Sequence, residues 1–205
     1  MGCGAFGVPP PASETFVDAS VDIVRFVDLP SARMPAARRE IEEIFFEASL
    51  KRKFASVVAR AAFRWRWLEQ YLAREPELSF VAVDGRGVVR GYLVGSLSDP
   101  ASLAAFGDLP YVRDLAPLTR MSPAHLHINV AAALRGQGVG SRLIEAFTGE
   151  ARAAGARAIH VMTGAGMRNV GFYAREGFVE RGRAASGGSE VVLLVRDLRD
   201  CTDGR

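Results

Sequence analysis

Lysine and cysteine are scarce in this sequence of 205 residues, and each shortage excludes a class of protein. Lysine occurs only at positions 51 and 53, so arginine supplies all the others of the 26 basic residues. A nucleotide-triphosphate loop of the type GxxxxGK[ST] is therefore excluded beyond that point, because its lysine has to reach the phosphates. The preference for arginine, together with abundant alanine, is typical of a GC-rich bacterial genome.

The two cysteines, Cys3 and Cys201, lie near opposite ends of the chain and form neither a disulfide framework nor a metal-ligand spacing. We therefore expect no metal site and a reducing, cytoplasmic environment. No apolar run approaches the roughly 18 residues of a membrane span, and the first residues lack the basic and apolar regions of a signal peptide. A membrane partner is not expected.

Charge is not concentrated anywhere, since the net charge is +3 and the only dense run is Lys51-Arg52-Lys53. Such a run on a solvated helix flank does not indicate a nucleic-acid partner. The length and a hydrophobic content of 49% suit one domain with a sizeable core. We expect that domain over residues 21–198, with a flexible N-terminal tail over 1–20 and a C-terminal tail over 199–205.

Apolar periodicity predicts the elements of the N-terminal half. They are a strand over 21–29, helices over 35–50 and 53–74, and strands over 78–84 and 88–97. The second helix carries an apolar stripe at helical spacing, which we expect to be buried with its tryptophan in the core. The stripe consists of Val57, Val58, Ala61, Trp65, Leu68 and Leu72.

Residues 99–123 show no strong period and are long for a loop. Loops of this length in a compact domain are usually functional or disordered, and we expect this one to cover an acceptor site. Its acidic and aromatic side chains are Asp99, Phe106, Asp108, Tyr111 and Asp114. The acidic groups would suit a cationic amine.

The C-terminal half begins with a strand over 125–130 and a Gly-rich loop. A helix to about residue 154, a strand over 158–163, a helix over 167–176 ended by Gly177, and strands at 179 and 190–195 follow. The helix after the loop has an apolar face of Val139, Leu143, Ile144, Phe147 and Ala151. The order predicts an α/β fold of the α+β mixed-sheet kind, with helices on both faces and a right-handed parallel crossover over 125–163.

The Gly-rich loop is the most informative stretch, because a loop of small residues leading into a helix binds anions. Backbone N–H groups point outward there, and the helix dipole favours negative charge. Gly138 and Gly140 would let a phosphate approach the backbone closely. A Rossmann loop is disfavoured, because the glycines at 136, 138 and 140 give GxGxG rather than GxGxxG and lie late in the chain.

Two segments resemble the GCN5-related N-acetyltransferase (GNAT) family. Residues 135–140, Arg-Gly-Gln-Gly-Val-Gly, match its [Q/R]xxGx[G/A] signature, and residues 171–178 resemble its FYxxxGF segment. The resemblance implies one GNAT-like domain with a mostly antiparallel sheet, and acetyl-CoA as co-substrate. Residues 115–118 and 123–130 further resemble the acetyltransferase-like domain of O-GlcNAcases and its free-standing bacterial relatives, a branch whose members may bind acetyl-CoA without clear catalysis.

The resemblance also implies which residues hold the coenzyme. The backbone of Asn129, Val130 and Ala131 would hold the pantetheine arm, and residues 136–141 the pyrophosphate, with Arg142 adding a charged contact. The full set is Asn129, Val130, Ala131, Arg135, Gly136, Gln137, Gly138, Val139, Gly140, Ser141, Arg142 and Asn169. Asn169 is displaced by three positions from the family's usual asparagine, where this chain has Gly166.

For catalysis, Tyr173 matches the family's tyrosine near the coenzyme sulfur and would protonate the leaving thiolate. His125, His127 and Asn129 fall on one face of their strand, and His127 is the preferred general base. Water leading the proton to an acid such as Asp114 is an equally open route.

Two functions remain open. The first is an N-acetyltransferase acting on a small amine or a protein lysine, and the second is a non-catalytic acetyl-CoA-binding module on the same fold. A homodimer that pairs through residues 190–195 is also possible, because such contacts are common in folds of this kind.

Overall fold

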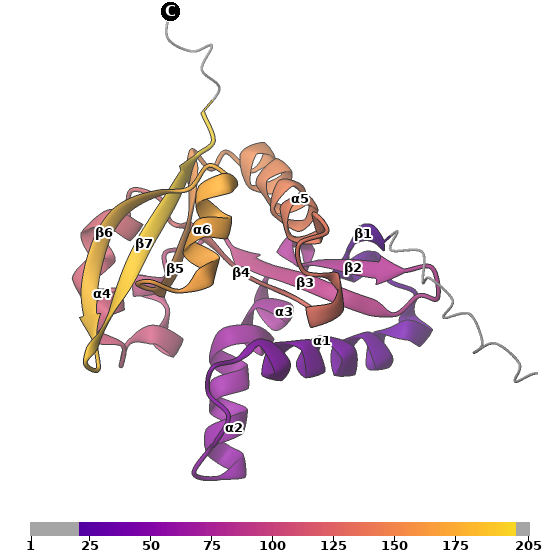
Figure 1. The fold of residues 1–205 in the computed structure, drawn as a ribbon. Helices are drawn as coiled ribbons and strands as arrows, with labels where there is room; N and C mark the ends of the chain where they lie inside the picture. Colours follow the sequence, from indigo (N-terminus) through magenta and orange to yellow (C-terminus); the bar gives the residue numbers. More distant parts are fainter. Residues whose placement is uncertain (1–20, 200–205) are drawn as a thin grey trace, which may run out of the picture.

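Seven strands form a single sheet in the computed structural model, which describes residues 21–199 (Figure 1). The strands are β1 (Val21–Arg25), β2 (Phe80–Asp84), β3 (Val89–Ser96), β4 (Ala124–Val130), β5 (Ala158–Gly164), β6 (Val179–Ser186) and β7 (Ser189–Asp197). Their order is β1-β2-β3-β4-β5-β7-β6, and every neighbouring pair is antiparallel except β4 and β5. The predicted mixed sheet with one parallel crossover is confirmed.

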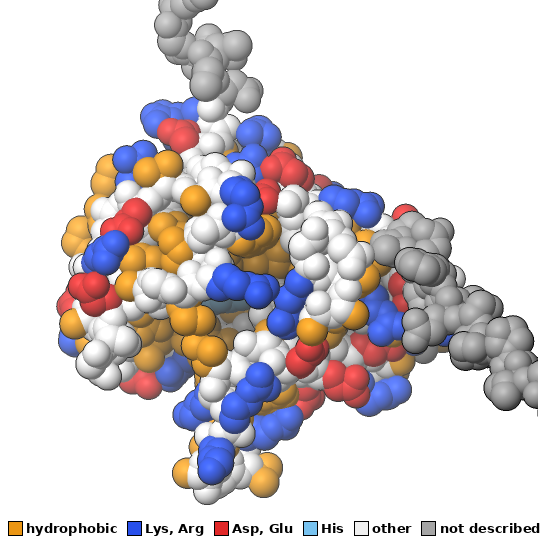
Figure 2. Space-filling view, viewed as in Figure 1, with side chains coloured by type: hydrophobic (Ala, Val, Ile, Leu, Met, Phe, Trp, Pro, Cys, Tyr) orange, Lys and Arg blue, Asp and Glu red, His pale blue; other side chains and the backbone are white. Residues whose placement is uncertain are grey.

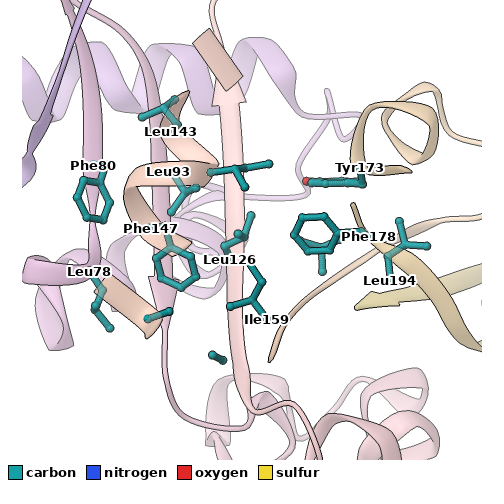
Figure 3. Packing of buried hydrophobic residues seen from close by; sticks show 14 of the residues in the cluster. Leu78, Phe80, Leu93, Leu126, Leu143, Phe147, Ile159, Tyr173, Phe178 and Leu194 are labelled. Carbon is teal, nitrogen blue, oxygen red and sulfur yellow. The ribbon is translucent and has the colours of Figure 1, made fainter. Parts of the chain in front are cut away.

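Helices cover both faces of the sheet. They are α1 (Met34–Ala48), α2 (Val57–Arg64), α3 (Gln70–Arg74), α4 (Pro110–Thr119), α5 (Val139–Ala153) and α6 (Arg168–Arg175). One apolar cluster joins α5 to the sheet through side chains such as Leu93, Leu126 and Phe147 (Figure 3). A second cluster, which includes Ile41 and Tyr71, joins α1 and α3 to the opposite face. Among the described helices, none is long and apolar enough to cross a membrane.

The predicted apolar face of α5 is confirmed, because all five of its side chains are buried. The sheet makes room for this helix at Gly95 of β3. A Cβ atom at Gly95 would lie 2.3 Å from Cε2 of Phe147 and 2.9 Å from the backbone oxygen of His125. The absence of a side chain at this position therefore lets the phenyl ring pack directly against the strand.

The predicted helix over 53–74 is confirmed from Val57 onward, but it is not a uniform α-helix. α2 ends at Arg64, a π-helical segment follows over Trp65–Glu69, and α3 completes the run. An inserted π turn changes the rotational phase of the side chains that follow it. Leu68 and Leu72 are buried as expected, whereas Val57, Val58 and Ala61 of α2 and Trp65 of the π-helical segment are exposed. α2 projects from the rest of the molecule in Figure 1.

The segment over 99–123 consists mostly of helical structure and is not an open loop. It forms two 3₁₀ turns, Pro100–Ser102 and Ala104–Phe106, followed by α4. Two prolines, at the start and inside α4, hide its helical pattern in the sequence. α4 packs on β6 at Gly182, where a Cβ atom would lie 2.5 Å from Cδ1 of Leu118.

Residues 190–195 lie in β7, which pairs with β5 on one side and with β6 on the other. Because both of its edges are occupied, this strand cannot extend the sheet into a second copy of the chain. The sheet edges are β1 and β6. The first strand also ends earlier than predicted, since Phe26–Asp28 form a 3₁₀ turn.

Candidate coenzyme and acetyl-transfer site

The parallel strands β4 and β5 pair only at their beginnings. Ala124 is opposite Ile159 and His125 is opposite His160, and no further pairs follow between these two strands. By contrast, β4 pairs with β3 over six residues and β5 pairs with β7 over all seven of its own. The two strands therefore diverge, and Figure 2 shows a hollow floored by hydrophobic side chains near this point.

The backbone of β4 alternates between β3 and this opening. The N–H of Ala131 donates to the carbonyl of Arg90 at 2.9 Å. Because opposite residues in an antiparallel ladder alternate between bonded and non-bonded pairs, Asn129 also faces β3, whereas Ile128 and Val130 turn their N–H and C=O groups toward the opening. Of the three expected backbone contacts to pantetheine, only Val130 is thus oriented for one, and Ile128 joins it.

The Gly-rich loop presents bare amides at the start of α5. Gly136 and Gly138 adopt left-handed backbone conformations, with φ of 79° and 78°, and a Cβ atom at either would meet no heavy atom within 4 Å. Gly138 is the N-cap of α5, and no side chain caps the helix there. The first amides of α5 are therefore left to an anion or to water.

Gly140 has a packing role in addition to the one expected. A Cβ atom there would lie 2.9 Å from Cζ of Phe172 in α6. This glycine therefore allows α6 to pack closely against the first turn of α5. The missing side chain therefore supports the packing of the loop, and the expected contact of the Gly140 backbone with a phosphate stays a prediction.

Several polar side chains of the loop are already engaged with the protein. Gln137 donates to the carbonyl of Ala133 at 2.8 Å, and the Ser141 hydroxyl donates to Glu176 at 2.6 Å. Arg142 donates to the carbonyl of Val21 at 2.7 Å, so its guanidinium is held by β1. These contacts leave the backbone amides of the loop, rather than these side chains, available to a ligand.

Arg135 and Asn169 also make intramolecular hydrogen bonds. Nε of Arg135 donates to the carbonyl of Val130 at 2.9 Å, which ties the loop back to the end of β4. The amide oxygen of Asn169 accepts from the Thr163 hydroxyl at 3.0 Å, which ties α6 to β5. Both residues hold the elements that border the opening.

Tyr173 is buried on α6, and its side chain extends toward β4 with the hydroxyl at that end (Figure 3). Its ring packs against Phe172 and Phe178, with centroid distances of 5.3 and 5.5 Å. Burial raises the pKa of the phenol above its ordinary value, so Tyr173 keeps its proton at neutral pH. This is the protonation state that an acid for a leaving thiolate requires.

All three histidines of the chain meet on the other face of the sheet. The Tyr71 hydroxyl lies 2.9 Å from Nε2 of His125 and 2.9 Å from Nε2 of His127. The His160 ring stacks on His125, and its Nδ1 lies 2.5 Å from the carbonyl of Ser122. The cluster therefore combines four side chains from α3, β4 and β5.

The predicted common face of His125, His127 and Asn129 is confirmed by their partners. The Asn129 amide donates to the Tyr92 hydroxyl at 2.7 Å, and Tyr92 and Tyr71 belong to the same apolar cluster. Leu126 packs instead in the cluster under α5. The sequence analysis missed Tyr71, although its position three residues after Leu68 places both on one helical face.

Burial keeps the three histidines neutral. It lowers the pKa of all three, to about 3 for the enclosed His160, and the neighbouring His125 further lowers the pKa of His127 and of His160. His125 and His160 are fully enclosed, whereas His127 retains partial exposure. Solvent or a substrate can therefore reach His127 alone among them.

The acidic residues of the 99–123 segment do not converge on this cluster. Asp108 pairs with Arg66 at 2.7 Å, and the Asp99 carboxylate caps its own turn through the N–H of Ala101. Asp114 is exposed on α4. Within residues 21–199, no group of three or more His, Cys, Asp or Glu side chains has the arrangement of a metal site.

Comparison with known proteins agrees with this geometry. Residues 39–178 match the family described as "Acetyltransferase (GNAT) family". The chain belongs to this family. The strand divergence and the Gly-rich loop are therefore those of a GNAT domain, whereas membership of the O-GlcNAcase-like branch stays a prediction.

Solved structures show the same fold. The crystal structure of SsHAT is 26% identical, with a TM-score of 0.69 over 88% of this chain and 100% of that one. An N-acetyltransferase from Staphylococcus aureus Mu50 is 18% identical, with a TM-score of 0.60 over 88% and 99%. A chain of the NatC complex bound to Gag peptide and CoA is 15% identical, with a TM-score of 0.58 over 87% of this chain and 99% of that one. The last two likenesses concern the fold alone.

Proposed function

We propose that this GNAT protein is an acetyl-CoA-dependent N-acetyltransferase in which an amine attacks the acetyl thioester directly, with both substrates bound together. The observation that carries this proposal is the unpaired edge of β4, which leads into the uncapped start of α5. An extended amide-containing arm fits the first feature, and a pyrophosphate fits the second.

In this arrangement the backbone of Ile128 and Val130 holds the pantetheine arm, and the amides of residues 136–141 hold the pyrophosphate. An N–H group of β4 beside the thioester would also polarise its carbonyl as charge develops on the oxygen. Holding both substrates in one geometry supplies the proximity that direct attack needs.

Two protons have to move in the transfer. The amine nitrogen bonds to the acetyl carbon and gives up a proton, while the carbon–sulfur bond breaks and the thiolate takes one. Tyr173 donates to the thiolate and then recovers a proton from solvent. His127 accepts the amine proton, and the acceptor is a small amine or a protein lysine.

Calorimetric titration tests the coenzyme site. We expect wild type to bind acetyl-CoA and coenzyme A but not NAD, and Gly138→Glu to lose both interactions, because its carboxylate would repel the pyrophosphate. Gly149→Glu is the matched control, since Gly149 lies exposed on the same helix with no atom within 4 Å of its Cβ position. Absence of coenzyme A binding in wild type would refute the proposal.

Turnover with a panel of amines tests the chemistry. Tyr173→Phe should lower kcat by about tenfold or more and leave the Kd for acetyl-CoA unchanged. Wild-type values for both quantities would remove Tyr173 from the mechanism. Tight acetyl-CoA binding without turnover on any amine would instead identify a non-catalytic binding module. The hydrogen bonds at both ring nitrogens of His125 agree with that alternative as well, because they leave this residue a structural role.

A further inference from the structure

The Tyr71 hydroxyl connects two histidines but has a single proton to share. It lies 2.9 Å from Nε2 of both His125 and His127. Tyr71 is buried, and burial together with the charge of Glu75 raises its pKa well above the ordinary value, so the phenol stays protonated. The hydroxyl must therefore donate to one histidine and accept from the other.

The direction of donation along this series of hydrogen bonds follows from the backbone carbonyl at its end. Nδ1 of His125 lies 3.2 Å from the backbone oxygen of Pro123, and a carbonyl can only accept. Nδ1 of His125 thus carries the proton, and because this imidazole is neutral, its Nε2 is bare and accepts from Tyr71. The Tyr71 oxygen then accepts from Nε2–H of His127, whose Nδ1 is left bare.

We propose that Tyr71 is a positioning residue that holds His127 in the tautomer with a bare Nδ1, so that Nδ1 is the atom that takes the proton from the amine. This inference rests on the proposed acetyltransferase function. It assigns a direction to a hydrogen-bond network whose members come from two segments more than 50 residues apart.

The setting of His127 agrees with this assignment. His127 is the one histidine that retains exposure, and its Nδ1 has no hydrogen-bond partner among the described residues. The Trp67 and His127 rings pack nearly perpendicular with their centroids 5.2 Å apart, which restricts rotation of the imidazole. Trp67 lies in the π-helical segment and Tyr71 follows directly in α3, so this irregular turn places both side chains against β4.

The proton transfer balances at His127. The amine nitrogen forms its bond to the acetyl carbon, and its proton passes to the lone pair of Nδ1, which makes the imidazole positive. Nε2–H continues to donate to Tyr71 throughout. Nδ1 then returns the proton to solvent, and the same tautomer is restored for the next turnover.

Nitrogen-15 NMR of the imidazole rings tests the assignment without any substrate. The chain has only three histidines, so single substitutions of His125 and His160 assign the ring signals. In wild type we expect His127 to carry its proton on Nε2 with a bare Nδ1, and His125 to carry its proton on Nδ1. A His127 protonated on Nδ1 with a bare Nε2 would overturn the proposal.

The variant Tyr71→Phe tests the role of the hydroxyl. It should convert His127 to a mixture of tautomers and lower kcat by about tenfold or more, with the KM for acetyl-CoA unchanged. Tyr92→Phe removes another buried tyrosine hydroxyl on the same face and should leave the His127 signals as in wild type. Unchanged His127 signals in Tyr71→Phe would overturn the positioning role.

These outcomes are separable from the test of the proposed function. If wild type does not bind acetyl-CoA, the acetyltransferase proposal is overturned and, with it, the catalytic part of this inference. A protein that binds and turns over acetyl-CoA but carries the His127 proton on Nδ1 would overturn this inference alone. The wild-type spectrum gives this answer even if Tyr71→Phe does not fold.

Discussion

Helices α5 and α2 have the same kind of apolar stripe and opposite environments. On α5, Leu143 and Phe147 are fully enclosed, whereas on α2, Val57 and Val58 are 85% and 77% exposed. Apolar spacing of this kind predicts a helix in both places. Such spacing therefore determines which side chains share a face, but not whether another surface covers that face.

The difference arises from what lies opposite each helix. α5 packs across β1 to β4, and Gly95 gives Phe147 a close fit there. α2 contacts α1 through Phe63, whose ring centroid lies 5.4 Å from that of Phe45, and through Arg60 and Arg64, which both hydrogen-bond Glu42. Figure 2 shows hydrophobic side chains at the surface of the projection that α2 forms in Figure 1.

The largest effect that would test this comparison is expected on α5. Phe147→Ala should lower the free energy of unfolding by about 3–5 kcal/mol, because it leaves a cavity between the helix and β3. Urea denaturation of both proteins would measure it. A loss below about 1 kcal/mol would mean that the sheet closes around the gap, and that α5 is less tightly packed than its burial indicates.

Acid should lower the free energy of unfolding through the buried histidines. The pKa of His160 is about 3 in the folded protein and about 6.5 in an unfolded chain, so below pH 6.5 the unfolded state binds more protons. The free energy of unfolding should therefore fall as the pH drops from about 6.5 toward 3, by up to about 1.4 kcal/mol per pH unit for this group.

His160→Asn isolates this contribution, because an amide can still donate to the carbonyl of Ser122 while it does not titrate. Urea denaturation at several pH values between 7 and 4 should give a shallower dependence in the variant. Equal slopes in the two proteins would show that His160 binds as many protons in the folded as in the unfolded state, so that burial does not lower its pKa.

A smaller and more local effect is expected at the start of α2. The Ser56 hydroxyl accepts from the N–H of Ala59 and caps this helix. Ser56→Ala should weaken the local helix by about 1 kcal/mol and increase amide hydrogen exchange in α2 without affecting α5. Faster exchange in both helices would mean that they unfold together, which would weaken the contrast between them.

The smallest effect should come from the exposed stripe itself. Val58→Gln is expected to change the free energy of unfolding by no more than about 0.5 kcal/mol, since the side chain already faces solvent. Thermal and urea denaturation at two protein concentrations would measure it. A large, concentration-dependent loss would show that a second copy covers this face of α2 in solution.

The features that could be predicted from the sequence depend on neighbours along the chain. The Gly-rich loop, the start of α5 and its buried face, and the common face of His125 and His127 all follow from short-range spacing. The missed features depend on context. Three of them leave no local signal in the sequence. They are the π turn before α3, the helix α4 with its two prolines, and the packing of Gly140 against Phe172.

The motifs at 135–140 and 171–178 carry the resemblance to the GNAT family, and local sequence patterns also predict a Gly-rich loop leading into a helix and a neighbouring strand with two histidines on one face. These properties follow from backbone preferences and side-chain periodicity, which act over a few residues. Three features appear only once the chain is folded: β4 and β5 diverge, α2 keeps its apolar face exposed, and Tyr71 joins His125 to His127. Those outcomes depend on which distant surfaces meet, because burial and hydrogen bonding across the sheet are settled by packing and not by sequence spacing.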